Sequence, residues 1–72
     1  MNQLSVDDIL AYMSVHAIPF VKPGVDIQRV VSGTAPATIS AVAETIKTQT
    51  PHIDVQVEES GRNTFTVTLV QR

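Results

Sequence analysis

Hydrophobic residues recur along this chain at two spacings, one typical of helices and the other typical of strands. In the first stretch they fall three or four residues apart and form one stripe, made by Val6, Ile9, Leu10, Met13 and Ala17. Ser5, with Asp8 three residues later, matches a capping box, and Pro19 stops the helical pattern. The sequence therefore predicts a helix over residues 5–16.

The next stretch, residues 18–31, predicts a hairpin of two strands. Apolar and polar residues alternate on both sides of Lys22-Pro23-Gly24, which has the composition of a tight turn. Because Pro19 cannot donate a hydrogen bond to a neighbouring strand, its short strand is expected at an edge of the sheet. The alternation fails at Arg29-Val30-Val31, where we expect a bulge that keeps Val30 inward and Arg29 outward.

A second helical stripe follows, made by Ile39, Val42, Ala43 and Ile46. Pro36 suits the first turn of this helix, Thr34 is a candidate cap, and Pro51 ends it. The stretch before it, Gly33 to Thr38, raises the question of a ligand-binding loop. A phosphate loop needs several glycines and a Lys-Ser/Thr pair, so we interpret this stretch as a corner that leads into a helix over residues 36–49.

The last part of the chain alternates strictly and predicts a β-hairpin. One face of its two strands is apolar, with Ile53, Val55 and Val57 on the first strand and Phe65, Val67 and Leu69 on the second. Residues 60–63 join the strands and are rich in turn formers. The 53–58 strand is expected at an edge of the sheet, where Asp54, Glu58 and Glu59 discourage aggregation by their charge.

These elements predict a single α+β domain over residues 1–72 with the order αββαββ. We expect a two-layer sandwich of the permuted ferredoxin-like kind, with a four-stranded antiparallel sheet and both helices on one face. In this arrangement the second and the last strand are central, and the strand that contains Pro19 lies at an edge.

Composition and charge narrow the range of partners. The chain has 72 residues, no cysteine and a net charge of −2, and its five basic residues are scattered. Because nucleic-acid binding needs a clustered positive surface, no nucleic-acid partner is expected. No stretch approaches the roughly 20 apolar residues of a membrane span, so no direct span is expected in this chain.

No cluster of residues indicates catalysis, and no catalytic, cofactor-binding or metal site is expected. His16 and His52 do not stand at metal-ligand spacing. Asp7 and Asp8 are explained by the start of a helix, and Glu58 and Glu59 by solvation near a turn. We therefore expect neither an enzyme nor a cofactor, and a protein surface becomes the candidate site.

The candidate interaction surface is the sheet face that the helices leave open. It is uncharged to mildly acidic and rich in threonine, and flat sheets of this kind bind proteins, although they are also ordinary solvated surfaces. Asp26 and Gln28 of the second predicted strand belong to the same face. The candidate residues are Asp54, Gln56, Glu58, Thr64, Thr66, Thr68 and Val70.

The run from Val25 to Arg72 resembles the small ferredoxin-like domains of secretion and pilus assembly platforms, namely the type II secretion M protein and the inner-membrane N and O proteins of type IV pili. The matching positions are Gly33 and Ala35, Ile39 to Ile46, Pro51 with Val55 and Val57, and Phe65, Val67 and Leu69. The resemblance implies a non-catalytic, self-associating domain at the periplasmic face of the inner membrane. Without it, a cytoplasmic location is expected.

A second resemblance is to sulfur carriers of the TusA type, through Pro23-Gly24 and Pro36-Ala37-Thr38. The Cys-Pro-x-Pro stretch of that family is missing, because this chain has no cysteine. Sulfur transfer is therefore excluded even if the fold is shared.

Three functional hypotheses follow from the sequence. The first is a protein-interaction domain, a self-associating module of a secretion or pilus assembly platform that forms a homodimer. The second is a small stand-alone inhibitor or adaptor, for example one encoded by a phage, which binds one host protein; the Met1 start and the compact length favour it. The third is an enzyme or small-molecule binder with a pocket lined by His16, His52 or the carboxylates.

Overall fold

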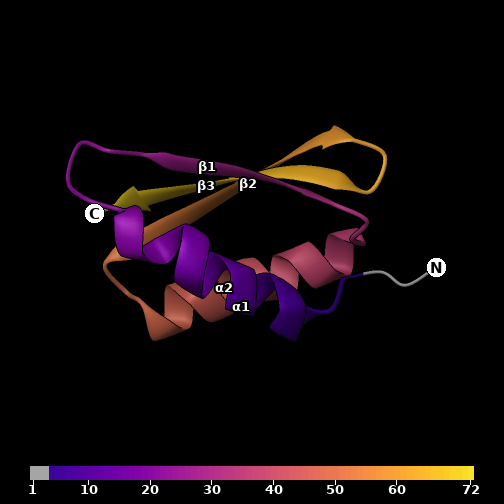
Figure 1. Cartoon of the computed structure of the whole chain (residues 1–72), viewed down its shortest axis with the longest axis horizontal. Coiled ribbons are helices and arrows are strands. Elements are labelled where there is room, and N and C mark those ends of the chain that lie inside the picture. Colours follow the sequence, from indigo (N-terminus) through magenta and orange to yellow (C-terminus); the bar gives the residue numbers. More distant parts are fainter. Residues whose placement is uncertain (1–3) are drawn as a thin grey trace.

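A computed structural model describes residues 4–72 and arranges them in two layers, a sheet and a pair of helices (Figure 1). The first three residues of the expected 1–72 domain lie outside the described part. Strand β3 lies between β1 and β2 and pairs antiparallel with both, so the α+β class is confirmed. The elements in chain order are α1 (Val6–His16), the 3-10 helix η1 (Ile18–Phe20), β1 (Ile27–Ser32), α2 (Pro36–Gln49), β2 (Ile53–Gly61) and β3 (Thr64–Gln71).

Helix α1 begins at the predicted capping box. The backbone N–H of Asp8 donates to Ser5 Oγ over 3.1 Å, and the N–H of Ser5 donates back to Asp8 Oδ2 over 3.3 Å. These two bonds satisfy donors that the first turn leaves without a partner, which fixes where the helix starts. From this start, the predicted stripe faces the core, where Ile9 and Met13 are buried.

The expected strand over residues 18–21 does not form, so the prediction of a four-stranded sheet is wrong. The sheet has three strands, and this segment makes η1 instead. Phe20 N–H donates to Ala17 O over 3.0 Å and Val21 N–H donates to Ile18 O over 3.2 Å. Local turns therefore satisfy the N–H groups that a strand would have offered. Ile18 and Val21 both pack against the core, at the three-residue spacing of a 3-10 turn and not at the spacing of a strand.

The turn at Lys22-Pro23-Gly24 is present, but it closes only one isolated bridge, between Lys22 and Val25. The N–H of Val25 donates to Lys22 O over 3.0 Å, and Gly24 adopts a φ of +79°. Residues 18–21 form no strand that pairs with the outer side of β1. The prediction that the second strand of the hairpin, β1, would be central is therefore also wrong. Strand β1 lies at an edge of the sheet, as β2 does.

The bulge expected at Arg29-Val30-Val31 does not form either. Strand β1 pairs with β3 in an unbroken register from Ile27 opposite Leu69 to Ser32 opposite Thr64. Regular alternation buries Val31, leaves Val30 exposed and turns the half-buried Arg29 toward the helix layer, the reverse of the prediction for Val30 and Arg29. The irregularity of this sheet lies in β2, where the register shifts between Glu59 and Gly61.

Helix α2 spans the predicted residues, but its entry differs from the prediction. Ala35 is the N-cap residue and makes no side-chain capping bond, with Pro36 in the first turn. Thr34, the predicted cap, is fully buried, and its N–H donates to Asn63 O over 3.2 Å. Gly33 adopts a φ of +73°, which agrees with the interpretation of this segment as a corner.

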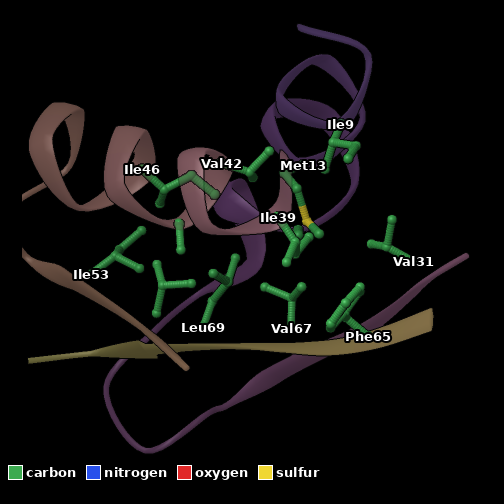
Figure 2. Close-up of a cluster of buried hydrophobic side chains, with 13 residues drawn as sticks. Ile9, Met13, Val31, Ile39, Val42, Ile46, Ile53, Phe65, Val67 and Leu69 are labelled. Atoms are coloured by element: carbon green, nitrogen blue, oxygen red, sulfur yellow. The ribbon is translucent and has the colours of Figure 1, made fainter. Parts of the chain in front are cut away.

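The predicted hairpin is formed by β2 and β3, with Arg62-Asn63 as its two-residue loop. Asn63 adopts a φ of 51°, a left-handed conformation that asparagine tolerates better than most residues. Both helices cover the same face of the sheet, because residues of α1, α2 and all three strands share one core (Figure 2). The buried core residues are Ile9, Met13, Ala17, Val31, Ile39, Val42, Ala43, Ile46, Ile53, Val55, Phe65, Val67 and Leu69.

Candidate functional site

The seven residues of the candidate interaction surface lie together on the sheet face that points away from the helices. They alternate along β2 and β3 with buried core residues, which point the other way. The register places them side by side: Asp54 opposite Val70, Gln56 opposite Thr68, Glu58 opposite Thr66, and Thr64 opposite Gly61. The structure therefore brings together the residues that the sequence grouped on one face.

Strand β1 extends this face on the other side of β3. Gln28 lies opposite Thr68, Val30 opposite Thr66, and Ser32 opposite Thr64. A shallow hollow on this face is lined by Gln28 together with Gln56, Val57, Glu58, Thr66 and Thr68. Most of these side chains are polar, so the face as a whole is suited to water or to a polar partner.

The carboxylate of Asp54 already has partners within the chain. Asp54 Oδ1 accepts a hydrogen bond from the N–H of Val55 over 3.1 Å and lies 3.7 Å from Arg72 Nη2. The side chain of Arg72 is 61% exposed and that of Asp54 is 42% exposed, so this ion pair is screened by water. This corner of the candidate surface is therefore engaged internally and carries little free charge.

A second hollow, which the sequence did not indicate, lies between α1 and β1. It has a volume of about 280 Å³ and is lined by Leu4, Asp8, Ile9, Tyr12, Val30, Val31 and Ser32. The N–H of Leu4 donates to Gly33 O over 3.0 Å, which ties the start of α1 to the end of β1. Apart from Asp8 and Ser32 the lining residues are hydrophobic or aromatic, so this hollow is the more apolar of the two.

Sequence reasoning missed this hollow because it placed another strand beside β1. The available signal was the pair Leu4 and Tyr12, which fall outside the apolar stripe of α1. In the structure they are 41% and 46% exposed and border the hollow. Large apolar side chains outside the core-facing stripe of a helix indicate a possible binding surface separate from the core.

The residues considered for catalysis or metal binding are not gathered in the structure. His16 and His52 are exposed, one at the end of α1 and the other just before β2. The ring of His16 lies beside Tyr12, with 4.8 Å between the ring centroids. Within residues 4–72, no three His, Cys, Asp or Glu side chains are placed to hold a metal ion.

Helices α1 and α2 have 11 and 14 residues, and neither of them is long and apolar enough to cross a membrane. Comparisons with protein-family models, with curated proteins and with solved structures give no match. A functional proposal for this chain therefore depends on the chemistry of its own surfaces.

Proposed function

We propose that this chain is a non-catalytic protein-interaction domain that associates with a second copy of itself. One observation carries the proposal: within the described residues β1 is an edge strand that pairs only with β3, and its outer side borders an apolar hollow. Exposed strand edges offer backbone donors and acceptors to an added strand, which makes them binding sites when nothing covers them.

Three of the exposed apolar side chains, Leu4, Tyr12 and Val30, border the hollow beside β1. Among residues 4–72, seven large hydrophobic side chains are exposed, and Val57 is the one that lies on β2. The other six all come from the segment that contains α1, η1 and β1: Leu4, Tyr12, Val15, Phe20, Val25 and Val30. Burying apolar area of this kind is the main favourable contribution to association.

The proposed setting is a secretion or pilus assembly platform, where the domain holds neighbouring subunits together. This part of the proposal is based on the resemblance of the segment from Val25 to Arg72 to platform domains. The three-stranded sheet differs from the four-stranded arrangement expected for a ferredoxin-like domain. Self-association is the property that such a role requires, and it can be measured on the chain alone.

Sedimentation velocity over a dilution series of the full chain tests the proposal. We expect the weight-average sedimentation coefficient to rise with concentration from the monomer value toward the dimer value. A chain that remains strictly monomeric at its highest soluble concentration contradicts self-association.

The second candidate function is an adaptor or inhibitor that binds one foreign protein. The hollow between α1 and β1 favours it, because an extended segment of another protein fits between a helix and a free strand edge. A chain that is monomeric alone but forms a one-to-one complex with a purified partner through β1 supports this second candidate over the first.

A further inference from the structure

We draw no further inference here: the strongest candidate, the apolar hollow between α1 and β1, carries none, because nothing in the structure shows what covers it and Asp8, the one charged residue among those that line it, is engaged in the capping box of α1.

Discussion

Arg29 of β1 donates a hydrogen bond from Nη2 to the main-chain carbonyl of His16, 2.8 Å away at the C-terminal end of α1. Nη1 of the same side chain donates to Gln28 O over 2.8 Å. Carbonyl groups at a helix C-terminus lack partners within the helix and carry a partial negative charge, so a guanidinium is favourable there. This contact explains how a charged residue occupies a position of β1 that faces the helix layer.

We predict that Arg29→Met lowers the free energy of unfolding by about 1 kcal/mol, because it removes the bonds to His16 O and Gln28 O and keeps an apolar stem of similar length. Urea unfolding measures the change, at a protein concentration where the chain is monomeric. Arg62→Met is the control, since Arg62 is exposed in the β2–β3 turn. Equal stability of the two variants contradicts a structural role for the Arg29 contact.

Much of the fold was predictable from local patterns. The capping box fixed the start of α1, and the predicted bounds of α2 match the observed Pro36–Gln49. The strands of the last hairpin were identified by strict alternation, which is unambiguous when one face is apolar and the other polar. In each of these elements, the local signal and the packing of the core agree.

The prediction failed over residues 18–31, where the local signals were ambiguous. Ile18, Phe20 and Val21 fit a short strand or one turn of helix, and the packing of Ile18 and Val21 against the core decided for the turn. Arg29 was expected outward because a bulge was predicted where the alternation fails, whereas the regular strand turns it toward the helix layer, where it donates to His16 O. Contacts between segments distant in the sequence determine both the turn at residues 18–21 and the orientation of Arg29. A single sequence does not reveal such contacts.

The candidate site was predicted in the same uneven way. Alternation was enough to group the seven residues of the open face, and the register confirms that they are neighbours. The hollow between α1 and β1 was missed because a second strand was expected on the outer side of β1, where the described residues form none. The wrongly predicted edge strand therefore concealed an apolar hollow.

Thr34 has a buried hydroxyl whose replacement is predicted to stabilise the protein. Thr34 Oγ1 has no hydrogen-bond partner among the described residues, and the side chain is fully buried. We expect Thr34→Val to raise the free energy of unfolding by about 1 kcal/mol, since it removes an unsatisfied polar group and keeps the branched shape. Thr48→Val, at an exposed position of α2, is the control and should change stability by less than about 0.5 kcal/mol. Chemical denaturation measures the free energy of unfolding of both variants. If Thr34→Val is less stable than the wild type, the hydroxyl of Thr34 has a hydrogen-bond partner and the prediction is wrong.

Glycine is predicted to be required at position 33 because of the backbone conformation there, and not because a side chain would clash with its neighbours. An added Cβ at Gly33 meets no atom within 4 Å, but the φ of +73° is one that residues with a side chain rarely adopt. We expect Gly33→Ala to lower the thermal midpoint and to cost about 1 kcal/mol of stability. Gly61→Ala is the comparison, because its Cβ makes only an ordinary contact of 3.6 Å with Thr64 Cβ and Gly61 is not at positive φ. A smaller loss at Gly33 than at Gly61 argues against this explanation.

Met13 and Val15 lie two residues apart on α1, and truncation to alanine is predicted to destabilise the protein strongly at Met13 and hardly at all at Val15. Met13 is 0% exposed in the core that α1 shares with α2 and the sheet, whereas Val15 is 63% exposed. We expect Met13→Ala to cost about 2–5 kcal/mol, through lost apolar burial and the cavity it leaves. Val15→Ala should change stability by less than about 0.5 kcal/mol, because alanine also favours the helix. Guanidinium unfolding of monomeric protein measures both. A similar loss for the two variants means that α1 is rotated about its axis relative to the core, and the hollow beside β1 is then lined by other residues.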